Sequence, residues 1–78
     1  MLTGAQIRAA RALLNWSARQ LAENSDISWT TIQRLEQHDL VPPSRSQTLL
    51  ELQKVFEEAG VEFIGSPDDA PGVRLRRP

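Results

Sequence analysis

The fold of this chain is decided by residues 17–36, which read SARQLAENSDISWTTIQRLE. Ser17 and Gln20 have the spacing of a capping box, in which the two side chains satisfy free backbone N–H groups at the start of a helix. Ser28 is a second N-cap residue. Asn, Ser and Asp at positions 24–26 favour a turn. The stretch therefore predicts two short helices joined by a tight turn.

Each of these two helices has one apolar face. We expect the first over residues 18–24, with Leu21 turned inward, and the second over residues 29–37, with Ile32 and Leu35 turned inward. Two helices connected in this way form a helix–turn–helix, whose second helix lies in the DNA major groove in proteins that bind DNA.

The same stretch resembles the helix–turn–helix of the phage repressor/Cro family, also called the XRE family. The matching positions are Ser17, Leu21, Ala22, Ser25, Asp26, Ile27, Ser28, Ile32 and Glu36. The wider similarity covers roughly residues 4–60. Asp26 stands where the family usually has Gly, at a position that needs a positive φ, which Asp adopts only at some cost. The resemblance implies a double-stranded DNA partner and a role as a sequence-specific transcriptional regulator.

One further helix is expected on each side of this stretch. Thr3 and Gln6 have capping-box spacing and predict a helix over about residues 4–14. Ser44 is the expected N-cap of another helix, which ends near Ala59 because Gly60 is a typical terminator. Their apolar side chains recur at helical spacing and are expected to face the core: Ile7, Ala10, Leu13, Leu14, Leu49, Leu52, Val55, Phe56 and Ala59.

The remaining residues predict a small β-hairpin. Residues 61–64 and 73–76 alternate between apolar and polar side chains, and residues 65–72 between them are rich in turn formers. The fold class is therefore mainly α, with about four helices and a short C-terminal hairpin. We assign residues 1–60 to the helix–turn–helix domain and residues 61–78 to the hairpin and a basic tail of the same unit.

Composition limits what else the chain can be. Its 78 residues make one domain, and it contains no cysteine, one histidine (His38) and a net charge of −1. With no thiol and no clustered carboxylates around His38, we expect neither a metal, a cofactor nor an enzyme activity. The absence of a long apolar run predicts a cytoplasmic protein without a membrane partner.

The outward positions of the second helix are the candidate DNA contacts. By the resemblance, Trp29, Thr30 and Arg34, with Gln33 beside them, are expected to contact bases. The chemistry agrees. Arg can donate two hydrogen bonds to guanine, Gln can pair with adenine, and Thr can form a hydrogen bond or contact a thymine methyl group. For Trp29, packing across the turn onto the preceding helix is the alternative.

Four further side chains are expected at the DNA backbone. Their polar groups lie near helix ends or in the following loop, where phosphate contacts are common: Ser17, Arg19, Gln37 and Arg45. The resemblance also implies a structural ion pair between Arg11 and Glu36, which would hold the second helix at a fixed angle.

The hairpin is the predicted dimer surface. A single helix–turn–helix buries too little DNA for high specificity, so a homodimer is expected. Exposed strand edges pair with other chains, so we expect the dimer to form through residues 61–76 and the helix before them. The predicted interface residues are Val61, Phe63, Val73 and Leu75. The weak net charge leaves a second function open, namely a protein-interaction module such as an antitoxin that binds a toxin partner.

Overall fold

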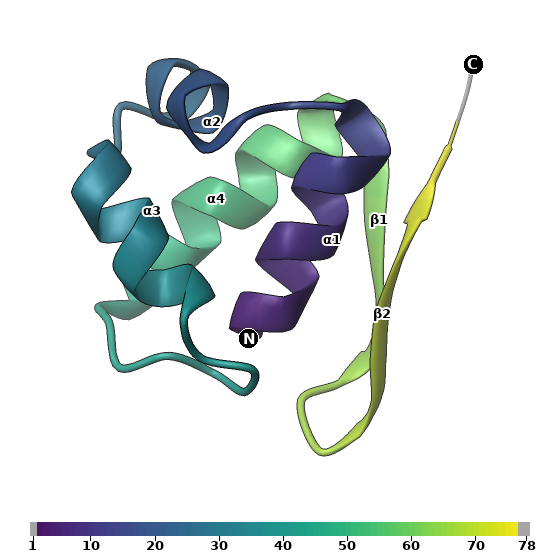
Figure 1. Cartoon of the computed structure of the whole chain (residues 1–78). Coiled ribbons are helices and arrows are strands. Elements are labelled where there is room, and N and C mark those ends of the chain that lie inside the picture. Colours follow the sequence, from purple (N-terminus) through teal and green to yellow (C-terminus); the bar gives the residue numbers. More distant parts are fainter. Residues whose placement is uncertain (1, 77–78) are drawn as a thin grey trace.

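Four helices and a C-terminal antiparallel hairpin follow one another along residues 2–76, the part of the chain that the computed structural model describes (Figure 1). The elements are α1 (Gly4–Leu14), α2 (Ala18–Ser25), α3 (Trp29–Glu36), α4 (Ser46–Glu58), β1 (Val61–Ser66) and β2 (Asp69–Leu75). The protein is therefore mainly α, as predicted. Residues 77 and 78 of the predicted basic tail lie outside the described residues. None of the described helices has both the length and the apolar character needed to cross a membrane.

The predicted caps set the helix ends in the first half of the chain. Thr3 and Ser17 both form complete capping boxes, with Gln6 and Gln20 respectively. Asn15 and Asp26 end α1 and α2 in the left-handed conformation, with φ values of 58° and 60°. We call residues 17–37, which contain α2, the turn and α3, the helix–turn–helix.

Helices α1 and α4 lie in the middle of the molecule, between the helix–turn–helix on one side and the hairpin on the other (Figure 1). The fully buried side chains join all four helices and include Ile7, Leu21, Ile32, Leu35, Leu49, Leu52 and Phe56. Leu13 was predicted to face this core but is 40 % exposed. With about 3.6 residues per turn, the line through Ile7, Ala10 and Leu14 leaves Leu13 on the flank of α1.

The start of α4 differs from the prediction. Arg45, and not Ser44, is the N-cap residue, and no side chain caps this helix. The Arg45 carbonyl accepts hydrogen bonds from the N–H groups of Thr48 and Leu49. Since these bonds set the first turn, Ser44 lies one residue before the position from which its hydroxyl could cap.

The hairpin is longer and tighter than predicted. The strands include most of residues 65–72, which we expected to form a loop, and only Pro67 and Asp68 lie between them. The register changes between Ile64 and Ser66, opposite an extra residue in β2. Gly65 and Ala70 adopt positive φ values of 76° and 51° at this bulge. The two positive φ values and the extra residue form a β-bulge, which lets this turn-rich sequence remain paired.

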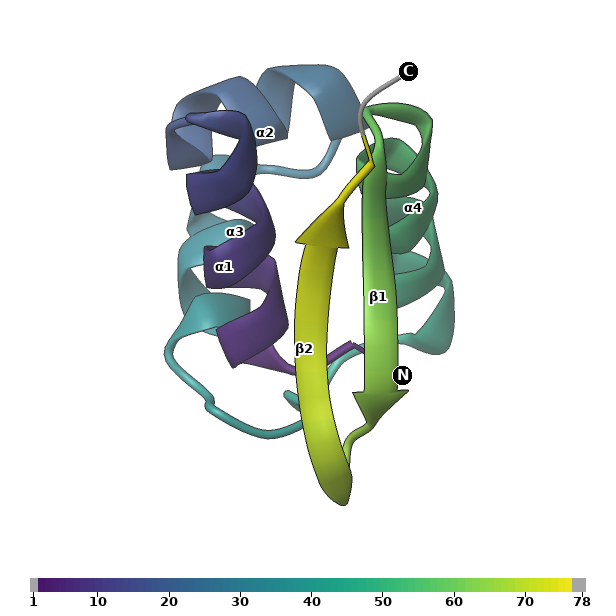
Figure 2. The ribbon, with the colours of Figure 1, turned by 90° about the vertical axis from the view of Figure 1, so that its right-hand side faces the viewer.

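The inner side of the hairpin packs against the protein's own core (Figure 2). β2 lies beside α1 and β1 lies beside α4. Val61 is only 2 % exposed, and Phe63, Val73 and Leu75 pack against the same core. Val61 was therefore wrongly predicted at a dimer interface. The apolar face that we expected a second chain to cover is covered by α1 and α4.

One side chain of α1 ties the hairpin to the helices. Gln6 is 6 % exposed. Its Oε1 accepts from the Thr3 N–H at 3.0 Å, while its Nε2 donates to the carbonyls of Gly72 at 2.9 Å and Ile64 at 3.4 Å. The capping side chain of α1 thus also bridges both strands.

Candidate nucleic-acid interface

The outer face of α3 is polar and exposed. Ile32 and Leu35 are fully buried on its inner face. The four predicted base-contacting residues all lie on the outer face and are exposed: Trp29, Thr30, Gln33 and Arg34. Gln37, at the end of the helix, is exposed as well. The helix ends at Glu36, one residue earlier than expected, with Gln37 as its C-cap. Its shape therefore presents hydrogen-bonding side chains along a single surface.

An ion pair with two hydrogen bonds attaches α3 to α1. Arg11 donates from Nε and Nη2 to the two carboxylate oxygens of Glu36, each at 2.8 Å. Its Nη1 also donates to the Trp16 carbonyl at 3.1 Å. The hydrogen bond to Glu36 raises the pKa of Arg11, against the opposing effect of burial. The structure thus forms the pair that the resemblance implied, and the pair orients the outer face of α3.

A second arginine of α1 binds the end of α3. Arg8 donates to the Glu36 carbonyl and forms an ion pair with Asp39 at 2.6 Å. Gly4 allows this end to approach closely, since a Cβ atom on Gly4 would lie 1.8 Å from the His38 carbonyl oxygen. The C-terminal end of α3 is therefore held by α1 at several points.

The N-terminal ends of α2 and α3 meet through an arginine and a tryptophan. The guanidinium carbon of Arg19 lies 4.7 Å from the centroid of the Trp29 ring. This geometry is that of a cation–π contact. Trp29 therefore contacts α2, as our alternative for this residue stated, and the residue remains 36 % exposed.

Arg34 is steadied by the loop that follows α3. Its Nη1 donates to the Pro43 carbonyl at 2.9 Å. A guanidinium has five N–H donors, so this bond leaves donors free on an exposed side chain. No sequence pattern indicates this contact, because it depends on how the proline-containing loop returns past α3.

Unpaired positive charge gathers around α3. Among residues 2–76, the cations without a carboxylate within ion-pairing distance are Arg19, Arg34, Arg45 and Lys54. Three of them belong to the helix–turn–helix or to the end of the loop after it. The acids at the end of α3, Glu36 and Asp39, are paired with Arg11 and Arg8. Three arginines around α3 therefore have no carboxylate partner within residues 2–76, and two acids of the same region, Glu23 and Asp26, have no cationic partner there either.

Ser17 has a defined structural task. Its hydroxyl accepts from the Gln20 N–H at 3.1 Å, and its own N–H donates to the Gln20 side chain at 2.8 Å. Both groups are exposed. The capping box accounts for the residue, while its predicted phosphate contact, like those of Gln37 and Arg45, stays a prediction.

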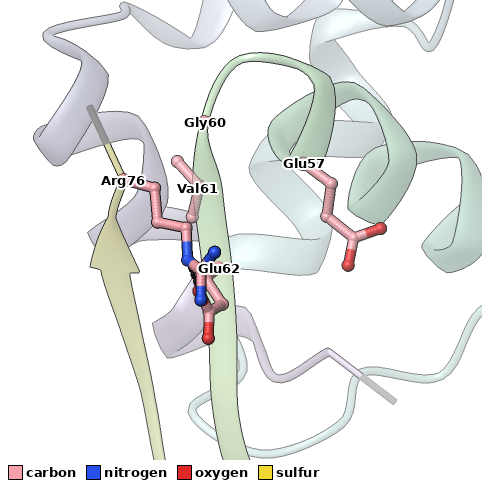
Figure 3. Close-up of a pocket in the computed structure, with 5 residues that line it drawn as sticks. All are labelled: Glu57, Gly60, Val61, Glu62 and Arg76. Carbon is pink, nitrogen blue, oxygen red and sulfur yellow. Dashed lines mark ion pairs between the residues drawn. The ribbon is translucent and has the colours of Figure 1, made fainter. Parts of the chain in front are cut away.

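A hollow lies at the far end of the molecule, between the end of α4 and the hairpin (Figure 3). Glu57, Gly60, Val61, Glu62 and Arg76 line it. Glu62 is already paired with Arg74 and Arg76, and hydrogen bonding to Arg74 is the main cause that lowers its pKa. Within the described residues, no group of three or more His, Cys, Asp or Glu side chains is arranged to hold a metal ion.

Comparisons with known proteins add no family to this description. A scan against protein-family models gives no match for the chain. A search of curated proteins gives no match either. The functional assignment therefore depends on the geometry and charge of the surface around α3.

Proposed function

We propose that this protein binds double-stranded DNA in a sequence-specific manner and acts as a transcriptional regulator. One observation carries this proposal: the exposed face of α3 bears hydrogen-bonding side chains that include Arg34, which has no carboxylate partner within residues 2–76, while the acids at the end of the helix are paired with arginines of α1. The helix is also rigidly attached, through Arg11 and Glu36. A rigid helix with such a face suits insertion into the major groove.

In this proposal Arg34 is the principal base-reading residue. Arginine discriminates guanine by donating two hydrogen bonds to O6 and N7. The bond to the Pro43 carbonyl restricts the side chain before DNA arrives and leaves other N–H groups for the base. Gln33 would read an adjacent adenine, and Thr30 would contact a base or a thymine methyl group.

The remaining exposed polar residues would contact phosphates. Arg19 in α2 and Arg45 at the start of α4 have no carboxylate partner within residues 2–76, and Gln37 and Ser17 lie at helix ends. Each phosphate that a cation neutralises releases condensed counterions, so affinity falls as salt rises. The proposal thus requires a steep salt dependence in spite of the acidic net charge.

The test begins with selection of bound duplexes from a randomised DNA library. We expect one enriched motif, and we expect Arg34→Ala to lose roughly five- to 150-fold in affinity, with relaxed preference at one base position. Arg45→Ala should weaken all sequences alike and reduce the salt slope by about 1. Lys54→Ala is the matched control, because Lys54 lies on α4, outside the helix–turn–helix, and has no carboxylate partner within residues 2–76.

Two results would contradict the proposal. One is selection that enriches no motif together with affinity that does not change with salt. The other is an Arg34→Ala protein that keeps the base preference and affinity of the original chain while Lys54→Ala weakens binding as much as Arg45→Ala does.

A homodimer belongs to the same proposal. Dimeric helix–turn–helix proteins read half-sites about 34 Å apart, so the selected motif should be an inverted repeat. Since the core-facing side of the hairpin is used within one protomer, a dimer has to form through other surfaces. Sedimentation of the free protein and of its DNA complex measures the stoichiometry.

A second candidate is a protein-interaction module, such as an antitoxin. The exposed side of α4 favours it, because Leu50 is 58 % exposed there and Glu51, Glu57 and Glu58 have no ion-pair partner within residues 2–76. Leu50→Ser should then abolish capture of the protein partner without changing DNA binding. A weak salt slope for DNA would favour this candidate over the first.

A further inference from the structure

Arg19 and Trp29 come from different helices and meet only in the folded protein. Arg19 lies in the first turn of α2, and Trp29 is the first residue of α3. The guanidinium carbon lies 4.7 Å from the ring centroid. Both residues are exposed, and Arg19 has no carboxylate partner within the described chain.

The contact leaves the useful donors of Arg19 available. A cation above an aromatic ring interacts with the face of the ring. The N–H groups of arginine lie in the plane of the guanidinium, where they bind planar or forked anions such as phosphate. Arg19 can therefore keep its place over Trp29 and still donate to an anion.

Holding the side chain in place lowers the cost of binding. A free arginine side chain has many rotamers, and ordering it on binding costs conformational entropy. Trp29 restricts these rotamers before any ligand arrives. By contrast, the indole has one N–H donor and no acceptor, so it cannot bind a base through two hydrogen bonds.

We propose that Trp29 is a positioning residue, which holds the Arg19 guanidinium for a DNA phosphate at the N-terminal end of α3, and that it is not a base-reading residue. This inference rests on the proposed function. It assigns Trp29 and Arg19 to one phosphate-binding unit made by two helices. It also revises the prediction that Trp29 contacts bases.

The stacking itself is tested in the protein without DNA. The Trp29 ring shifts the NMR signal of the Arg19 side-chain Nε–H group if the two are in contact. We expect Trp29→Leu, which keeps apolar bulk, to move this signal to its position in an unstructured arginine. Trp29→Phe, which keeps an aromatic ring, should retain most of the shift. An Arg19 signal that is the same in all three proteins would overturn the proposal.

The effect on DNA is tested with a fluorescein-labelled duplex of mixed sequence, titrated at several salt concentrations. We expect Trp29→Leu to weaken binding roughly two- to fivefold, the size of an exposed cation–π contact. Arg19→Gln should weaken binding and reduce the salt slope by about 1. Adding Trp29→Leu to Arg19→Gln should cause no further loss, because the tryptophan then has no cation to position. Thermal melts of each variant check that the fold is retained.

Other results separate this inference from the proposed function. If Trp29→Leu alters base preference in the library selection, or weakens Arg19→Gln further, Trp29 acts on DNA by itself. The positioning role then fails, while the function stands. If the unaltered protein shows no salt-dependent affinity for DNA, the proposed function fails and takes the phosphate role with it, whatever the NMR signal shows about stacking.

Discussion

Two regions of the molecule are fastened to the same helix in different ways. The helix–turn–helix is joined to α1 by the Arg11–Glu36 ion pair, with both hydrogen bonds at 2.8 Å. The hairpin is joined to α1 by the Gln6 side chain, whose amide donates to carbonyls of both strands. The first attachment is charged and the second is neutral, and the hydrogen bonds of both are partly buried.

The two regions also differ in what specifies them. Each helix of the helix–turn–helix has its own N-cap, so much of its structure is encoded within a few neighbouring residues. The hairpin has a short turn and a bulge, and an isolated two-stranded hairpin is only marginally stable in water. Its stability depends on contacts with α1 and α4. One of these joins Phe63 of β1 to Phe56 of α4, whose ring centroids lie 5.9 Å apart. Variants that disturb one region and spare the other test this difference.

The largest effect is expected from Arg11→Ala. The Glu36 side chain is only 10 % exposed, so the change leaves a nearly buried carboxylate without its partner. We expect the free energy of unfolding to fall by about 3 kcal/mol in urea denaturation. Asp39→Asn is the control, because its pair with Arg8 is exposed and should contribute under about 1 kcal/mol. Equal losses for the two variants would mean that the Arg11–Glu36 pair does not anchor α3.

Gln6→Glu separates the two tasks of Gln6. A carboxylate can still accept from the Thr3 N–H and so keep the cap, but it cannot donate to the Gly72 carbonyl. We expect a loss of about 1–3 kcal/mol, because the part-buried carbonyl acceptors lose their donor. Hydrogen exchange should speed up in the hairpin amides before those of α2 and α3.

The matched control for Gln6→Glu is Gln20→Glu. Gln20 occupies the same place in the second capping box but is exposed. There the new carboxylate should be neutral or slightly stabilising, since negative charge is favourable at a helix N-terminus. If exchange in Gln6→Glu rises equally across the whole protein, the hairpin is not a separately anchored region.

A smaller effect distinguishes the turns of the two regions. Asp26 ends α2 with a φ of 60°, and Ala70 occupies the bulge with a φ of 51°. Glycine at either position relieves strain but adds entropy to the unfolded chain, so each gain should stay under about 1 kcal/mol. Ala70→Gly should gain more than Asp26→Gly, because aspartate tolerates this conformation better than alanine. A lower melting temperature for Asp26→Gly would reveal a role of the carboxylate in the turn.

The smallest expected effect concerns pH and the outer side of the hairpin. Hydrogen bonding to Arg74, helped by Arg76, lowers the pKa of Glu62 below its ordinary value of 4.5. The stability that these pairs contribute is therefore fully present above about pH 4.5 and disappears as the pH falls through the lowered pKa. In thermal melts, the difference between the original chain and Glu62→Gln should shrink on acidification. A difference that does not change with pH would show that these exposed pairs contribute nothing.

Local sequence patterns are sufficient to predict the two helices of the helix–turn–helix and most of the helix ends. Capping boxes, Asn15 and Asp26 act over three or four residues, so their effect can be read without knowing the fold. The helical spacing of the apolar positions also predicted that Ile32 and Leu35 face inward and Arg34 outward. The Arg11–Glu36 pair followed from the family resemblance, and the structure forms it.

The candidate site and the hairpin, by contrast, depend on contacts between segments that are distant in the sequence. Arg19 reaches Trp29, Arg34 reaches the Pro43 carbonyl, and Gln6 reaches the Gly72 carbonyl only after distant segments have packed together. The same packing placed the inner side of the hairpin on α1 and α4 and so removed Val61 from the surface predicted for a dimer. Local patterns carry the conformation of a few neighbouring residues. They do not show whether the protein's own helices or a second chain will cover the apolar face of a strand, because that depends on the free energy of burying the whole core.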